Sequence, residues 1–255
     1  MPIEKEIPFD QFIALDDEVR ASINLIQTGL AELQNIDDGN DFYYLPFILL
    51  SNGLEKLLKV IICFYFWEQK GHFPTMNDFK EKKNDNGHNL LYLKNKVLSE
   101  YFIANTPAIK EDLEILSNNE TLNKLIYFLG EFGQYSRFYN LDVIISNPKK
   151  KSKDIKRLWE KLETDLLLAD SELFNQLKKN LKNIDKEKVE NIRKINEQVQ
   201  KKTIILLEIF ARALTRQFAF GNLGQAKRFT GTIMPFLTLM DNELGKRDYR
   251  KMENK

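Results

Sequence analysis

Residues 42–67 are the feature that most constrains how this chain of 255 residues can fold. They read FYYLPFILLSNGLEKLLKVIICFYFW, an apolar run that Glu55, Lys56 and Lys59 interrupt near its middle. A helix of this length would cross a bilayer core of about 30 Å, but each charge at its centre would cost at least about 2.5 kcal/mol. With Asn52, these charges form one polar stripe on an otherwise apolar helix. We therefore predict that residues 44–69 form the central helix of a soluble bundle and not a membrane span.

The remaining composition also favours helices. Hydrophobic residues make up 43% of the chain, whereas it has only 11 glycines and 7 prolines for turns. Apolar residues recur at helical spacing throughout, which predicts an all-α fold. The predicted helices cover residues 9–35, 44–69, part of 72–83, 89–103, a short piece from Pro107, 120–145, 154–168, 171–181, 186–220 and 225–244, the last with a kink at Pro235.

Turn residues and charge divide the chain into three parts. The run Asn147-Pro148-Lys149-Lys150-Lys151-Ser152-Lys153 is typical of a linker. We predict a helical bundle over 1–147, a helical extension with a long helix and a terminal hairpin over 148–245, and a disordered tail over 246–255.

Charge is distributed unevenly along the chain. Residues 1–41 carry ten acidic and two basic side chains, whereas residues 149–202 carry sixteen basic and ten acidic ones. Such asymmetry can mark a nucleic-acid surface. It also arises where an acidic helix packs beside basic helices, in one fold or in a dimer. We favour this second explanation because it needs no ligand.

Several functional classes are excluded or disfavoured by the residues themselves. No phosphate-binding loop, dinucleotide fingerprint or nucleophile elbow occurs, and one cysteine with two histidines does not supply the usual structural zinc sets. We therefore predict no cofactor, no metal and no catalytic residue. Cys63 lies in the apolar run and is expected to be buried as a small hydrophobe. The acidic start lacks the pattern of a secretory signal, so we expect a cytoplasmic protein, and the Lys-, Asn- and Ile-rich composition suggests a bacterial one.

Three segments together resemble the HEPN superfamily, the higher eukaryotes and prokaryotes nucleotide-binding domain. They are LEKLLK at 54–59 within the apolar helix, GHNL at 87–90 opening the next helix, and RFYN at 137–140. The resemblance covers roughly residues 10–145 and implies an up-and-down helical bundle that could act as a dimer or bind RNA or a nucleotide. The candidate binding residues on this basis are Glu55, Lys59, His88, Arg137, Tyr139 and Asn140.

Many members of that superfamily are metal-independent ribonucleases that carry a histidine four to six residues after an arginine. This chain departs from the pattern, because its histidines are His72 and His88 and the positions after Arg137 hold Asp142, Val143 and Ile144. We therefore predict a non-catalytic binding or interaction protein related to toxin or defence systems, acting as a homodimer or with a partner protein. The alternatives are an RNA-cleaving toxin or defence ribonuclease with a rearranged site, and a structural adaptor.

Each candidate residue also has a purely structural explanation. Glu55 and Lys59 are spaced for an i, i+4 ion pair worth about 0.2–0.5 kcal/mol. His88 can cap or pack at a helix start, and Arg137 can bond to a neighbouring helix. A second candidate, a phosphate-binding patch, would combine the i, i+4 pair Arg212 and Arg216 with Lys227 and Arg228, although solvated charge explains these four as well.

Overall fold

The computed structural model describes residues 6–37, 39–82, 86–147, 151–182 and 185–251. Every regular element within these ranges is helical, which confirms the all-α prediction. The only extended pairing among them is an isolated bridge between Asp37 and Asn40 in the turn after the first helix. No helix in the described ranges is both long and apolar enough to cross a membrane.

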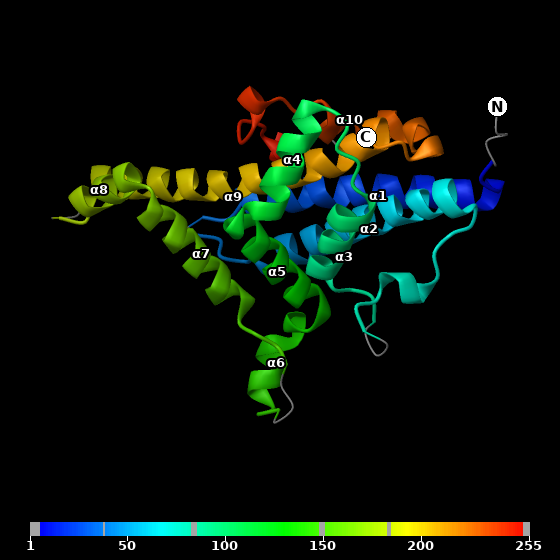
Figure 1. Cartoon of the computed structure of the whole chain (residues 1–255). Helices are drawn as coiled ribbons and strands as arrows, with labels where there is room; N and C mark the ends of the chain where they lie inside the picture. The colour runs from blue at the N-terminus through cyan, green and yellow to red at the C-terminus, as the bar shows by residue number, and fades with distance from the viewer. Residues whose placement is uncertain (1–5, 38, 83–85, 148–150, 183–184, 252–255) are drawn as a thin grey trace.

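Two long helices, α1 (Phe9–Gln34) and α2 (Tyr44–Lys70), lie side by side in the middle of the molecule (Figure 1). They approach closely because each presents a glycine to the other. A Cβ atom added at Gly29 would lie 2.6 Å from Leu50, and one added at Gly53 would lie 2.8 Å from Ile26. The central helix predicted over 44–69 is confirmed, and it ends at Gly71, whose positive φ suits glycine.

The remaining helices surround this pair. They are α3 (Leu90–Lys96), which continues into one π turn at Val97–Tyr101, then α4 (Pro107–Asn118), α5 (Glu120–Gln134), α6 (Tyr139–Ile144), α7 (Ile155–Ala169), α8 (Ser171–Asn180), α9 (Lys186–Phe220) and α10 (Thr230–Leu237). Short 3₁₀ turns occupy Met76–Phe79, Ser136–Phe138, Gly224–Phe229, Asp241–Glu243 and Tyr249–Lys251. Side-chain caps start many of the helices, and Pro107 stands at the first turn of α4 after its cap, Thr106.

Two predicted helices are interrupted in the structure. The helix expected over 120–145 breaks at Tyr135, and its second part turns away as α6. The helix expected over 225–244 begins as a 3₁₀ turn, and α10 ends at Leu237, two residues after Pro235. Proline has no N–H to donate and crowds the preceding turn, so it favours an early end to this short helix.

One hydrophobic core joins the two predicted domains. Trp159 of α7 packs on Phe47 of α2 with ring centroids 4.7 Å apart, and Phe218 of α9 packs edge-on against Phe64 of α2 at 5.7 Å. The boundary predicted between 147 and 148 therefore does not separate two cores. A second, small cluster of Leu173, Ile195 and Val199 holds α8 against the polar first half of α9.

The C-terminal segment is ordered as far as the described residues extend. Tyr249 is buried, its hydroxyl donates to Glu208 at 2.8 Å, and its backbone N–H donates to Gln34 at 2.8 Å. Burial raises the pKa of the Glu208 carboxyl. The prediction of a disordered tail is wrong for residues 246–251, because an aromatic ring and a buried carboxylate anchor them. Residues 252–255 lie outside the described ranges.

The central helix should be sensitive to cavities. Leu57 and Leu58 are both fully buried, so Leu57→Ala and Leu58→Ala should each lower the free energy of unfolding by about 2–5 kcal/mol. Urea denaturation would measure this. The same change at exposed Leu168 should cost no more than about 0.5 kcal/mol. Equal midpoints for all three variants would contradict the assignment of α2 as the core helix.

Candidate functional site

A surface groove lies where the start of α2, the end of α5, α6 and the start of α7 meet. Arg137, Tyr139 and Asn140, three residues singled out from the sequence, all line it. They are brought there because the chain leaves α5 through a 3₁₀ turn at Ser136–Phe138. The facing wall carries Tyr44 from α2 and Lys156 from α7.

Cations and aromatic rings alternate beside this groove. Four cations each lie over a ring of the same region: Arg137 over Phe138 at 5.0 Å, Lys151 over Tyr135 at 5.8 Å, Lys153 over Tyr127 at 4.8 Å and Lys156 over Tyr43 at 6.0 Å. We call these eight residues the basic-aromatic surface. Arg137 and Lys151 are exposed and form no ion pair with any described residue, whereas Lys153 pairs with Glu131 at 3.0 Å and Lys156 pairs with Asp41.

Further rings stand exposed at the groove's edge. Phe42 and Tyr44 are stacked with centroids 6.2 Å apart and planes 25° apart, and both are exposed. Tyr44 also meets Phe132 edge-on at 5.2 Å, which fixes its orientation. Exposed rings beside unpaired cations can stack on flat ligands and attract anions at the same place. The sequence predicted only a linker at Lys151 and Lys153. The rings of Tyr135 and Phe138, which precede these lysines by about a dozen residues or more, were a signal for this surface that the prediction left out.

A carboxyl group with a raised pKa lies in an adjoining cavity, which shares Asp41 and Tyr43 with the groove. Glu163 accepts hydrogen bonds from the Tyr43 hydroxyl at 3.3 Å and from the Trp159 indole N–H at 3.2 Å. Burial raises the pKa of Glu163 to about 7. Nothing in the spacing of the glutamates distinguished this residue, because its burial depends on α2 packing against α7.

Glu55, Lys59 and His88 meet elsewhere on the molecule. Lys59 Nζ donates to Glu55 Oε1 at 2.7 Å, which confirms the predicted ion pair, and His88 Nδ1 lies 2.7 Å from the same oxygen. Gly87, with a φ of 78°, makes the turn that places His88 there. A carboxylate at Nδ1 orients an imidazole so that the other ring nitrogen faces outward, an arrangement suited to proton transfer. Neither His88 nor Glu55 lines the groove that contains Arg137.

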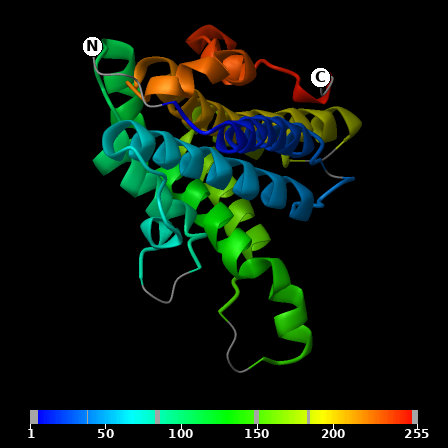
Figure 2. The ribbon, with the colours of Figure 1, turned by 90° about the vertical axis from the view of Figure 1, so that its right-hand side faces the viewer.

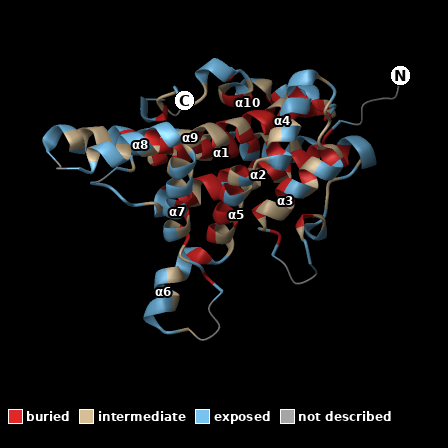
Figure 3. Cartoon of the chain, turned by 60° about the vertical axis from the view of Figure 1, so that its left-hand side comes forward, coloured by how far each residue is buried: buried red, intermediate tan, exposed pale blue. Residues whose placement is uncertain are grey.

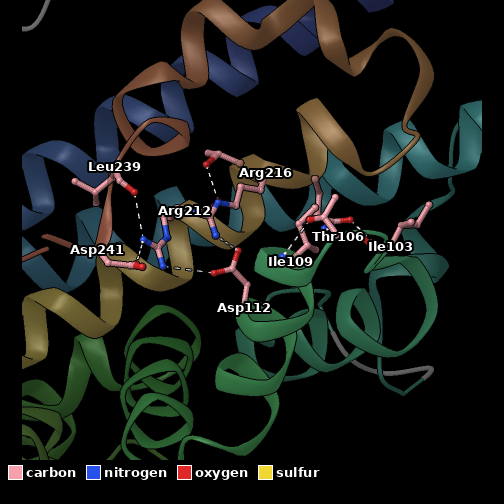
Figure 4. Close-up of polar contacts among 10 residues, drawn as sticks. Ile103, Thr106, Ile109, Asp112, Arg212, Arg216, Leu239 and Asp241 are labelled. Carbon is pink, nitrogen blue, oxygen red and sulfur yellow. Dashed lines mark hydrogen bonds and ion pairs between the residues drawn. The ribbon is translucent and has the colours of Figure 1, made fainter. Parts of the chain in front are cut away.

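The predicted phosphate patch does not form, because two of its members, buried Arg212 and partly buried Arg216, are paired with carboxylates (Figure 4). Arg212 is 4% exposed and donates to Asp241 at 2.6 Å, and Arg216 donates to Asp112 at 2.5 Å. Asp112 is itself only 1% exposed and lies 3.5 Å from Arg212 as well. These pairs attach α4 and the C-terminal segment to α9. Lys227 and Arg228 remain exposed, without the two arginines that were expected beside them.

Other chemically capable groups do not assemble into a site. Cys63 is half-buried as a free thiol, and burial raises its pKa to about 12, so the thiol stays protonated. No group of three or more His, Cys, Asp or Glu residues in the described ranges is arranged to hold a metal ion.

Comparisons with protein-family models, curated proteins and solved structures find no match to this chain.

The environment of Glu163 predicts a particular pH dependence of stability. Its folded pKa of about 7 lies above the usual carboxyl value of about 4.3. The folded state therefore keeps a proton that the unfolded chain loses, and the stabilisation from this proton disappears as pH rises from about 4.5 through 7. Glu163→Gln should flatten the dependence of the unfolding free energy on pH in this window and should be more stable than the parent at pH about 8.

Urea denaturation at a series of pH values would measure the effect of Glu163→Gln. Asp165→Asn removes one carboxylate from an exposed position on the same helix that does not shift the pKa of Glu163, and it provides the control. Parallel pH curves for the parent and Glu163→Gln would show that this carboxyl is not protonated near neutral pH.

Proposed function

We propose that this protein binds single-stranded RNA without cleaving it, and that the basic-aromatic surface and the adjoining groove form the binding site. The observation that carries the proposal is the set of four cations that lie over four aromatic rings. Two of these cations, Arg137 and Lys151, have no carboxylate partner among the described residues. Unpaired cations attract phosphates, and exposed rings stack on bases at about 1–3 kcal/mol per base.

Single strands fit this surface better than duplexes. The faces of bases are covered within a duplex, whereas a single strand can splay its bases onto protein rings. Phe42, Tyr44 and Phe138 offer such exposed rings, and Asn140 at the groove wall has an amide that can bond to a base edge. The resemblance to HEPN bundles supports the same ligand class, and with it a bacterial cytoplasmic protein related to toxin or defence systems.

Binding should depend on salt through Arg137. Each phosphate contact on a single strand contributes about 0.7 to the slope of log affinity against log salt. Arg137→Ala should therefore weaken binding of a fluorescent oligouridine and flatten that slope by about 0.7. Phe138→Ala should weaken binding with the slope unchanged, because it removes stacking and no charge.

Fluorescence anisotropy over a range of salt concentrations would measure both effects. Arg20→Ala removes an exposed arginine that pairs with Asp16 on α1, away from the groove, and should leave binding unchanged. Salt-insensitive binding, or none, would contradict the proposed site and leave the structural adaptor as the remaining function.

One observation favours a second candidate, the RNA-cleaving protein with a rearranged site. Glu55 orients His88, so a proton-transfer group exists, although it does not line the groove with Arg137. We expect the purified protein to leave labelled RNA intact in the presence of EDTA, because no imidazole adjoins the proposed phosphate site. Cleavage that is lost in both His88→Ala and Arg137→Ala would instead establish the ribonuclease.

A further inference from the structure

An apolar stripe on α6 and the turn before it is left without a partner in the described structure. Phe138, Leu141, Ile144 and Ile145 are all exposed, Ile144 by 77%, and their spacing places them along one side of the helix. Figure 3 shows α6 mostly in the colour of exposed residues, with none in the colour of buried ones, at the end of a projection from the body. An isolated exposed leucine is ordinary, but a contiguous apolar stripe marks an interaction surface.

The charge beside this stripe is positive. Arg137 and Lys151 are exposed and form no ion pair with any described residue. The carboxylate of Asp142 on α6 is already engaged, because it accepts hydrogen bonds from Asn147 at 2.8 Å and from Ser152 at 2.6 Å. A partner for α6 must therefore offer apolar side chains flanked by unpaired acidic groups.

The start of α1 offers such a surface. Phe9 is 75% exposed and Ile13 is also exposed, and with Asp17 they follow one line at spacings of four residues. Asp10 and Asp17 are exposed and form no ion pair among the described residues. This feature distinguishes them from the nearby Asp16 and Glu18, which pair with Arg20 and Lys56.

The two surfaces cannot meet within one molecule. The start of α1 lies in the upper layer of the molecule, whereas α6 projects from its lower side, so the two are well separated in both views (Figures 1 and 2). We propose that the α6 stripe of one copy docks on the Phe9–Ile13 face of α1 in a second copy. The reciprocal contact then closes a two-fold symmetric dimer, in which each surface is used once by each subunit.

The apolar stripe and the flanking charges have different roles in this contact. Burial of Ile144 and Leu141 against Phe9 and Ile13 supplies the affinity, because apolar area leaves water. The cations beside α6 and the acids of α1 set the register and accelerate association, so salt should weaken the dimer moderately. Leu141, Ile144 and Ile145 do not line the proposed RNA groove. Arg137, Phe138 and Lys151 belong to both surfaces, so RNA and the second copy should compete for them.

The apolar contact is tested by sedimentation velocity of the purified full chain over a range of concentrations. The parent should dimerise, and Ile144→Asp should weaken the association about tenfold or more, which corresponds to about 1.4 kcal/mol. Val189→Asp makes a similar change at another exposed apolar residue, on α9, and should dimerise like the parent. Circular dichroism of each variant checks that the fold persists. A parent that stays monomeric, or equal weakening by both variants, would overturn the proposal.

Charge reversal tests the pairing of the two surfaces. Lys151→Glu places an acid opposite the acids of α1, and Asp17→Lys places a cation opposite the cations of α6, so each variant alone should associate weakly. An equimolar mixture of the two should dimerise again, because one contact is then charge-reversed and the other is native. Failure of the mixture to recover would show that these surfaces do not face each other. At protein concentrations at which the parent is monomeric, Ile144→Asp should bind oligouridine with the same salt slope as the parent, which separates loss of the dimer from a failure of the proposed function.

Discussion

The close packing of α1 against α2 is the constraint on which the rest of the fold depends. Gly29 and Gly53 let the two backbones approach so closely that Leu50 and Ile26 fill the space a methyl group would take. This contact turns α2 so that its apolar faces meet α5, α7 and α9 and its charged stripe remains at the surface. A helix with apolar residues on most of its circumference is stable in water only when several neighbours cover it.

A group of ion pairs around the buried side chains of Asp112 and Arg212 holds the outer layer on this core. Asp112 of α4 lies between Arg212 and Arg216 of α9, and Asp241 joins Arg212 from the C-terminal segment. Taking these charges out of water is costly, so their mutual attraction adds little net stability, but loss of one partner would leave a buried charge uncompensated at about 3–5 kcal/mol. The group therefore specifies where α4 and the C-terminal segment dock more than it strengthens the fold.

The proposed RNA groove and the apolar stripe of α6 adjoin each other where α6 projects from the body. The groove is formed by the ends of helices and by the turn before α6, and α6 itself contributes no buried residue. Aromatic and basic side chains can be exposed at such positions without loss of packing, because these side chains are not part of the hydrophobic core. Glu163 at the adjoining cavity is an exception, since its burial against Tyr43 and Trp159 raises its pKa.

Local pattern alone determined the all-α class, the bounds of α1, α2 and α9 to within a residue or two, and the Glu55–Lys59 pair, because periodicity and i, i+4 spacing are properties of one helix. The resemblance to HEPN bundles, and not local pattern, selected Arg137, Tyr139 and Asn140, which do share a groove. Only the tertiary structure decided that Arg212 is neutralised and that the C-terminal segment docks. Both depend on partners far away in sequence, since Asp112 and Glu208 become buried partners only when the helices pack.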